Sequence, residues 1–290
     1  PGVHGESVVL RILDRSDTAV SLQQLGMPEK ILDQYQNIVT QPHGMVLITG
    51  PTGSGKTTTL YATLEKINNE KQKIITVEDP VEYQLDGITQ IQANASIGLS
   101  FAQGLRSIVR QDPDVLMIGE IRDHETAEIA IESALTGHLV FSTLHTNDAA
   151  GAVTRLQDMG VQGYLISSSM LAIQAQRLVR RVCTDCAQTH PLSTDEATVL
   201  EIDINIISEI RRGSGCERCG QTGYRGRVGL YELLIMSDAI RHHIASGADA
   251  NIIRDEAIIE GMRTLRQDAL EKLANGMTTP EEVVRVTRAL

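Results

Sequence analysis

The sequence predicts an α/β fold built on a mostly parallel sheet. Two observations carry this prediction: short apolar runs alternate with helical patterns, and a glycine-rich segment joins the first of these runs to a helix. Such alternation is typical of βαβ units, in which helices cover both faces of the sheet. The length of 290 residues corresponds to about two domains. An apolar content of 41% supports a buried core and excludes disorder as the dominant state.

The elements ahead of the sheet are predicted from their local patterns. Residues 1–15, with the strand-like run 7–13, are expected to end a preceding β-rich unit, and residues 16–40 to form a connector with a short helix near 27–40. The sheet and its helices are expected over 41–178. Its strands are predicted at 45–49, 74–77, 115–118 and 139–144.

Helices are predicted between these strands. One follows the glycine-rich segment over 58–68. Another covers 124–135, where apolar residues recur at i, i+3, i+4, i+7 and i+8 and so share one helix face. We interpret that face as packing against the sheet.

The alternation stops after residue 178. Two cysteine pairs and the glycine-rich stretch 220–229 predict a small inserted module over 179–228, and 229–290 is predicted to be a helical subdomain. Its helices are expected to break near Gly247, Gly261 and Gly276. The segment 279–282 fits a helix start, with Thr as cap and Pro at the first position.

Composition excludes several classes of function. The chain has 26 Lys and Arg against 37 Asp and Glu, a net charge of −11, and it has six Tyr, two Phe and no Trp. Nucleic-acid surfaces need positive charge and stacking aromatics, so we expect no nucleic-acid partner. No apolar stretch approaches a membrane span, and the first residues lack the pattern of a secretion leader, so we expect a soluble, non-exported chain. Without an initial Met, it is expected to be the carboxyl-terminal part of a longer protein.

A phosphate-binding loop is the most specific motif. The pattern G-x-x-x-x-G-K-[ST] is met at every fixed position between a predicted strand and a predicted helix. Its glycines let backbone N–H groups face a β-phosphate, Lys56 can reach the β- and γ-phosphates, and the Thr57 hydroxyl can bind Mg²⁺. The alternative is an accidental glycine-rich turn. The predicted nucleotide-binding residues are Gly50, Pro51, Thr52, Gly53, Ser54, Gly55, Lys56, Thr57 and Thr58.

Polar residues that could act on a nucleotide follow three predicted strands. Glu120 stands where P-loop proteins carry the Walker B acid that assists Mg²⁺, although Gly119 replaces the common Asp before it. The segment 78–82 places three carboxylates after a strand, and such an acid can orient water. His145 follows the last strand and could sense the γ-phosphate. The alternatives are an exposed acid at a strand end, a solvated acidic loop and a structural histidine.

All four cysteines fall in two C-x-x-C pairs, which predicts a structural zinc site. Two such pairs supply four thiolates for tetrahedral Zn²⁺, and the longer gap between them needs only a loop. Free thiols or a redox pair are the alternatives. The predicted ligands are Cys183, Cys186, Cys216 and Cys219.

Four spaced motifs resemble those of the type II secretion and type IV pilus assembly ATPases. They occupy 110–114, 119–123, 136–138 and 143–147. The resemblance covers nearly the whole chain and implies a hexameric, Mg²⁺-dependent motor of the additional-strand, RecA-like P-loop class, preceded by a PAS-like domain. It also implies that Glu82 activates water, that Glu120 is the Walker B acid, and that His145 lies near the phosphates.

Arginines are candidates because a guanidinium can stabilise the charge that develops in phosphoryl transfer. Arg11 is similar to a family arginine that reaches a nucleotide across an interface, and Arg227 resembles another essential arginine. Arg106 and Arg110 are expected to share a helix face. For each, a surface ion pair is the alternative.

The sequence therefore predicts an ATPase that uses ATP, Mg²⁺ and a structural Zn²⁺. The resemblance implies a cytoplasmic homo-hexamer, peripheral at the bacterial inner membrane through a membrane platform protein and a cytoplasmic recruitment protein. It does not separate secretion from pilus extension. Two other functions remain open: a nucleotide-switched scaffold with little turnover, and a nucleic-acid motor of the same fold, which the acidic charge opposes.

Overall fold

The computed structural model describes residues 3, 5–6, 8, 20–69 and 71–287. Within them, seven strands form one sheet in the order β3-β2-β4-β5-β1-β6-β9, parallel from β3 to β6 and antiparallel between β6 and β9. A separate antiparallel pair joins β7 to β8. The strands are β1 (Gly44–Thr49), β2 (Ile74–Glu78), β3 (Thr89–Gln92), β4 (Val115–Ile118), β5 (Leu139–Leu144), β6 (Met170–Val182), β7 (Ala187–Pro191), β8 (Glu209–Gly213) and β9 (Tyr224–Ile235).

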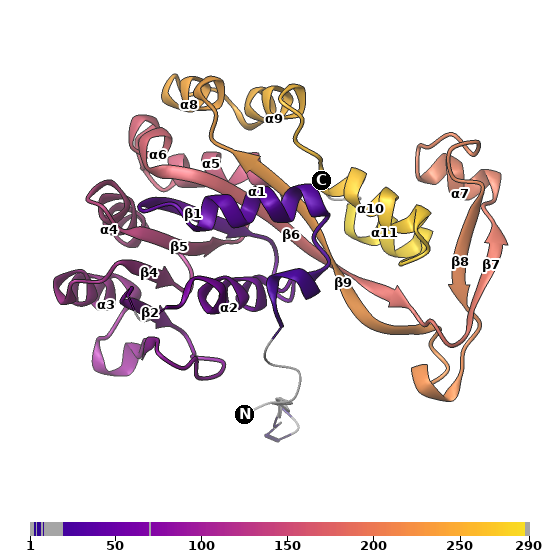
Figure 1. Ribbon diagram of the computed structural model, residues 1–290, viewed down its shortest axis with the longest axis horizontal. Helices are drawn as coiled ribbons and strands as arrows, with labels where there is room; N and C mark the ends of the chain where they lie inside the picture. The colour runs from indigo at the N-terminus through magenta and orange to yellow at the C-terminus, as the bar shows by residue number, and fades with distance from the viewer. Residues whose placement is uncertain (1–2, 4, 7, 9–19, 70, 288–290) are drawn as a thin grey trace.

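Helices cover both faces of the large sheet (Figure 1). Along β1, Met45 and Leu47 pack into one apolar cluster while Val46 and Ile48 pack into the other. Because successive side chains of a strand point to opposite faces, a continuous apolar run is buried on both sides. The helices are α1 (Glu29–Val39), α2 (Lys56–Ile67), α3 (Phe101–Ile108), α4 (His124–Leu135), α5 (Ala149–Asp158), α6 (Gly163–Ser169), α7 (Thr194–Val199), α8 (Asp238–Ala245), α9 (Ala250–Ile259), α10 (Leu265–Ala274) and α11 (Pro280–Thr287).

The predicted α/β fold and most of its predicted elements are confirmed. The four predicted strands are β1, β2, β4 and β5, and α4 has the predicted bounds. The helix after the glycine-rich loop begins at Lys56, two residues before the predicted start. The predicted breaks separate α8 to α11, each with its glycine at positive φ, and α11 begins at Pro280.

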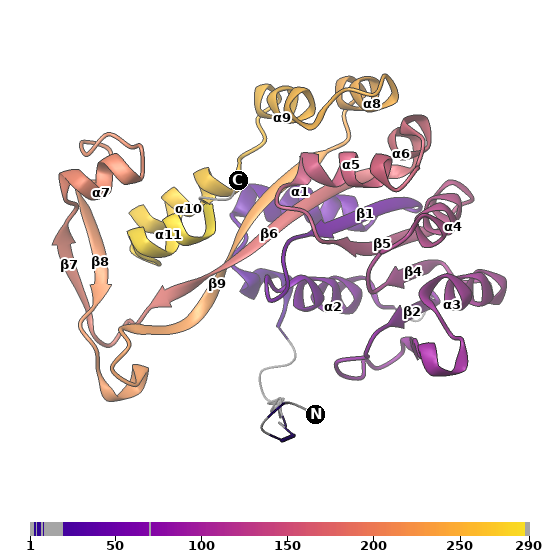
Figure 2. The ribbon, with the colours of Figure 1, turned by 180° about the vertical axis from the view of Figure 1, so that it is seen from behind.

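Strands β6 and β9 were not predicted, and they carry the chain out of the sheet. They pair from Ala172 opposite Ile235 to Val182 opposite Tyr224. Figures 1 and 2 show this pair extending beyond the sheet to β7, β8 and α7, with α10 and α11 between that outer part and the body. The boundaries expected at residues 178 and 228 therefore fall inside two paired strands and not in a flexible connection.

Part of the predicted amino-terminal organisation lies outside the described residues, including Arg11 and most of the strand-like run 7–13. Among the residues that the structure describes, no helix has both the length and the apolar character needed to cross a bilayer.

Candidate active site

The candidate site is a cavity of about 750 Å³ at the carboxyl edge of the parallel strands. The loops that follow β1, β2, β4 and β5 meet there, because the carboxyl ends of parallel strands share one edge of the sheet. Gly50 and Pro51 precede the part of the loop that borders the cavity. The predicted site residues that line it are Thr52, Gly53, Ser54, Gly55, Lys56, Thr57, Thr58, Glu82, Glu120, His145 and Arg227.

The glycine-rich loop is shaped by positive backbone angles and by close contact with β6. Gly50 has φ of +151° and Gly55 has φ of +88°. A Cβ atom on Gly50 would lie 2.4 Å from the carbonyl oxygen of Gln176, so a side chain there would collide with the β6 backbone. Only glycine satisfies both constraints at Gly50. Strand β6 therefore fixes the back of the loop.

Lys56 is buried at the first position of α2. Its Nζ donates hydrogen bonds to the carbonyl oxygens of Gly50, at 2.7 Å, and Pro51, at 3.2 Å. Burial lowers the pKa of Lys56, and the nearby charge of Glu120 opposes that shift. The ammonium group is thus held inside the loop that it serves.

Glu120 accepts hydrogen bonds on both of its oxygens. Arg122 donates to Oε1 at 2.5 Å, and Nε2 of His145 lies 3.2 Å from Oε2. The hydrogen bond from Arg122 lowers the pKa of Glu120, against the effect of burial. Arg122 also lies 4.0 Å from Asp79 and over the ring of Phe101. Sequence reasoning quoted Arg122 in a motif without giving it a role, and its spacing of two from Glu120 was the available signal.

The three carboxylates after β2 have different surroundings, although the sequence grouped them. Glu78 is the last residue of β2 and is buried, with 3% of its surface exposed. Asp79 lies near Arg122. Glu82 is half-buried, borders the cavity, and donates its backbone N–H to the Tyr61 hydroxyl at 3.2 Å. Glu82 is therefore the acid of this segment placed to meet water in the cavity.

The candidate arginines also separate. Arg227 reaches the cavity from β9. Arg106 forms an ion pair with Glu125 at 2.5 Å, and Arg110 lies in the short 3-10 turn that follows α3. Among the described residues, neither of these two borders the cavity.

The four cysteines come together at the outer end of the β6 and β9 pair. Their Sγ atoms all lie within 4.8 Å of one another, with separations of 3.9 Å from Cys183 to Cys216, 3.9 Å from Cys186 to Cys219, and 3.7 Å from Cys216 to Cys219. Four sulfurs at a Zn–S distance of about 2.3 Å in a tetrahedron lie about 3.8 Å apart. The arrangement fits a tetrahedral metal ion.

Backbone donors already favour a thiolate in this cluster. Cys219 Sγ accepts N–H groups from Cys216, at 3.2 Å, and Gly223, at 3.3 Å. Although burial favours the neutral thiol, these donors lower the pKa of Cys219. Burial and the neighbouring thiols raise the pKa of Cys186. Without a cation, then, the cluster does not hold all four groups as thiolates.

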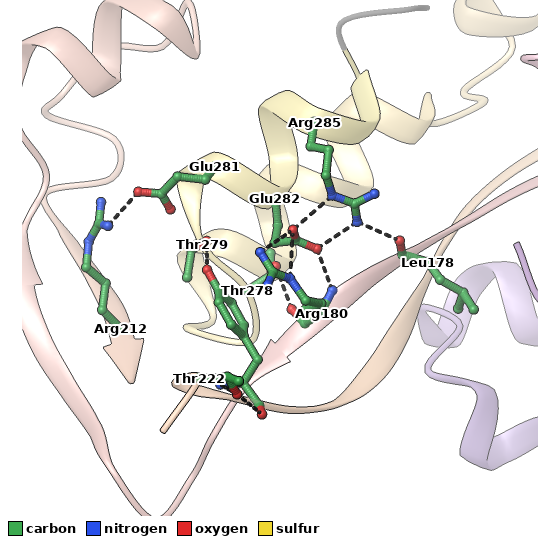
Figure 3. Close-up of polar contacts among 10 residues, drawn as sticks. Leu178, Arg180, Arg212, Thr222, Thr278, Thr279, Glu281, Glu282 and Arg285 are labelled. Atoms are coloured by element: carbon green, nitrogen blue, oxygen red, sulfur yellow. Dashed lines mark hydrogen bonds and ion pairs between the residues drawn. The ribbon is translucent and has the colours of Figure 1, made fainter. Parts of the chain in front are cut away.

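A buried carboxylate joins this outer module to the body (Figure 3). Glu282 of α11 accepts the backbone N–H of Arg180 at 2.7 Å and donors from the guanidinium groups of Arg180 and Arg285. Burial alone would favour the neutral acid, but the donors from both arginines lower the pKa of Glu282 to about 2. Arg212 of β8 pairs with Glu281 of α11, at 2.6 Å, and with Glu196 of α7. The junction is therefore held by charge.

Comparison with known proteins assigns the family. The family described as type II/IV secretion system protein matches residues 1–285. The chain belongs to this family. The RecA-like fold and the family expected from the motifs are both confirmed.

Individual relatives of this type II/IV secretion system protein agree with that assignment. The chain is 49% identical over 292 residues to type II secretion system protein E of Aeromonas hydrophila, covering 99% of this chain and 57% of that protein. It is 48% identical over 288 residues to type II secretion system ATPase E of Vibrio cholerae, with the same two coverages. The chain thus spans a little over half the length of these relatives.

A solved structure shares the fold of this family member. The crystal structure of the pilus retraction motor PilT with bound ADP matches with a TM-score of 0.69 and 30% identity. The match covers 94% of this chain and 69% of that one.

Proposed function

We propose that this chain is the ATP-hydrolysing part of a motor that powers type II secretion or the assembly of a type IV pilus. The observation that carries the proposal is that the phosphate-binding loop, Glu82, Glu120 and His145 line one cavity. The name of the Vibrio cholerae relative and the ADP bound to the PilT structure support it. The names of the relatives that are about half identical favour secretion over pilus assembly.

Each part of the cavity has a chemical role in this proposal. The N–H groups of the loop 50–55 and the ammonium group of Lys56 bind the phosphates. The Thr57 hydroxyl and the Glu120 carboxylate border the same cavity and are the hard oxygen ligands that Mg²⁺ prefers. When bound there, Mg²⁺ supplies positive charge that neutralises the β- and γ-phosphate oxygens.

Hydrolysis then requires a positioned water molecule. The water oxygen attacks the γ-phosphorus, and the bond from that phosphorus to the β–γ bridging oxygen breaks. ADP leaves with the bond electrons, and Glu82 accepts the proton of the water. His145 keeps Glu120 oriented through its hydrogen bond, and Arg227 stabilises the negative charge that develops.

The test is the rate of phosphate release by the Glu82→Gln variant. Loss of a general base costs about 10² to 10⁴ in rate, so we expect a fall of at least about 100-fold with unchanged ATP affinity. Asp86→Asn, an exposed acid of the same loop that does not line the cavity, is the matched control and should retain the rate. Full activity of Glu82→Gln would overturn the role of Glu82. A wild-type chain that binds ATP but releases no phosphate would favour the scaffold.

We also propose that the chain acts as a homo-hexamer in the cytoplasm, held at the inner membrane by a platform protein and a recruitment protein. The resemblance of the motifs and the names of the relatives support this. Arg11 and Arg227 are the candidates for an arginine that acts across a subunit interface. If one does, the ATPase rate per subunit rises with protein concentration. A rate independent of concentration and of enforced assembly would contradict the coupling.

We further propose that Cys183, Cys186, Cys216 and Cys219 bind a structural Zn²⁺. The sulfur separations and the C-x-x-C spacing support this. We expect about one Zn²⁺ per chain by elemental analysis, lost in Cys216→Ser, together with faster proteolysis of the module. Zinc that stays stoichiometric in Cys216→Ser would contradict coordination by four thiolates.

A further inference from the structure

A cluster of buried polar side chains lies directly beneath Glu82. It joins Tyr61 of α2, Glu78 of β2 and Gln90 of β3. The Tyr61 hydroxyl donates a short hydrogen bond to Glu78 Oε2, while Thr76 and Gln90 donate to Oε1 at 2.5 and 3.1 Å. Tyr61 is fully buried, and its ring meets that of Tyr83 edge to face, with the centroids 4.6 Å apart.

The Tyr61 hydroxyl has two distinct partners. It gives its proton to Glu78 and accepts the backbone N–H of Glu82 at 3.2 Å. Burial and the hydrogen bond to Glu78 raise the pKa of Tyr61, so that the phenol stays protonated and keeps its role as donor. The carboxylate of Glu78 thus fixes the orientation of the hydroxyl that holds Glu82.

The same cluster holds the rest of the Glu82 loop. Gln90 donates from Nε2 to the carbonyl oxygen of Tyr83 at 3.2 Å and accepts the N–H of Leu85 on Oε1 at 2.7 Å. Three elements therefore grip the backbone on both sides of Tyr83. Of these, only α2 also carries Lys56 of the phosphate-binding loop.

We propose that Tyr61 is a positioning residue, which ties the backbone of Glu82 to the helix of the phosphate-binding loop. This inference rests on the proposed function, in which Glu82 accepts the proton of water. With the link in place, the general base and the bound phosphates keep a fixed separation. A misplacement of about 1 Å in a reacting group can cost about 100-fold in rate, so a single hydroxyl can matter here.

The test is Tyr61→Phe, which keeps the buried ring and removes both hydrogen bonds. We expect kcat to fall by about 10- to 100-fold while the dissociation constant for ATP stays within about threefold. The chain offers a matched control in Tyr35→Phe. Tyr35 is also fully buried, and its hydroxyl shares a hydrogen bond with Thr63 of the same helix at 2.9 Å, but it does not border the cavity. Its removal should leave kcat within about twofold.

A double variant separates positioning from general structural support. If Tyr61 acts through Glu82, then Tyr61→Phe lowers kcat in the wild-type background and has no further effect in Glu82→Gln. Equal losses in both backgrounds, or a kcat for Tyr61→Phe equal to that of Tyr35→Phe, would overturn the proposal. Full activity of Glu82→Gln would instead overturn the proposed role of Glu82.

Hydrogen exchange gives a second measurement that does not depend on activity. In Tyr61→Phe the amide of Glu82 should exchange at least about tenfold faster, while the amides of α2 keep their protection. Unchanged exchange at Glu82 would contradict the link. A poorly folded variant would be recognised by loss of protection throughout α2, and the Glu82 amide would then be compared in Gln90→Met. That variant removes the other grip on the same loop, so the Glu82 amide should stay protected there as long as Tyr61 holds it.

Discussion

Two carboxylates of this protein accept hydrogen bonds from arginines, but their environments differ. Glu282 has 1% of its side chain exposed and receives donors from two arginines. Glu120 has 19% exposed and receives one arginine and His145. Glu282 is thus saturated with donors inside a joint, whereas Glu120 faces a cavity and keeps lone pairs for other partners. The difference separates an ion cluster that holds two parts together from one that can exchange its partners.

The partners of the two carboxylates differ in the same way. Arg122 divides its contacts between Glu120, Asp79 and the ring of Phe101. At the joint, the guanidinium of Arg180 stacks on the Tyr224 ring at 4.0 Å, and the Tyr224 hydroxyl shares a hydrogen bond with Thr279. The joint is therefore locked by several interactions, while the site cluster is open toward the cavity. We expect variants of Glu120 to affect catalysis and variants of Glu282 to affect stability.

The largest effect is expected for Glu120→Gln. Removing a group that stabilises charge in the transition state costs about 10² to 10³ in rate, so phosphate release should fall about 100-fold or more. The melting temperature should change by less than about 3 °C, because Glu120 is partly exposed. Phosphate release and thermal melting would be measured on the same preparation. A large loss of stability with retained activity would reverse the comparison.

A smaller effect, on stability, is expected for Glu282→Gln. The variant keeps the shape of the side chain and removes the charge that its arginine donors share. Hydrogen bonds to charged groups contribute about 1.5 to 3 kcal/mol, and the two arginines are half exposed, so we expect about 2 kcal/mol. Urea unfolding would measure this loss, and ATP affinity should stay within about twofold. An unchanged unfolding free energy would show that the joint is not held by this charge.

The stabilisation from Glu282 should also depend on pH. The pKa of Glu282 falls from 4.5 to about 2 on folding, so its contribution is complete above its unfolded pKa and is lost as the pH falls from there toward 2. The difference in unfolding free energy between the wild type and Glu282→Gln should therefore be constant above about pH 5 and shrink below it. A difference that instead grows on acidification would contradict the assignment.

The smallest effect is expected for Arg212→Ala. Arg212 bridges Glu196 of α7 and Glu281 of α11, and one third of its side chain is exposed. Ion pairs this accessible contribute about 0.2 to 1 kcal/mol, so the loss should stay below about 1 kcal/mol and diminish in high salt. A loss as large as that of Glu282→Gln would mean that the outer bridge, and not the buried carboxylate, holds the module.

The sequence predicted the parallel sheet because buried strands appear as unbroken apolar runs, as along 45–49 and 139–144. It also brought Glu82, Glu120 and His145 to one place, since each follows a strand whose carboxyl end lies at the same edge. These inferences need only local periodicity and the rule of parallel strands.

The long β6 and β9 pair could not be predicted in the same way. Strand β6 carries Gln174, Gln176 and Arg177 among its apolar residues, and all three are buried. Their role depends on partners from distant segments, such as Thr59, which donates to Gln176 at 2.8 Å. In β9, Gly229 interrupts the pattern because a Cβ there would lie 2.2 Å from the Tyr231 hydroxyl oxygen. Tertiary contact, not local preference, sets these positions.

The roles of Tyr61 and Arg122 were hidden for a related reason. Tyr61 is one apolar position of a helix when only the sequence is considered, and its hydroxyl gains a function from Glu78 and Glu82. These contacts join residues 17 and 21 positions apart. Only the folded chain brings them together.

Calorimetric titration of the protein with ATP and Mg²⁺, beside Lys56→Gln, tests the central claim most directly. Lys56 is held inside the phosphate-binding loop, so the account predicts saturable heat near one site per chain for the wild type. It also predicts binding at least about 100-fold weaker for Lys56→Gln, because a charge-assisted contact to phosphate is lost. Equal binding isotherms for the two proteins would contradict it.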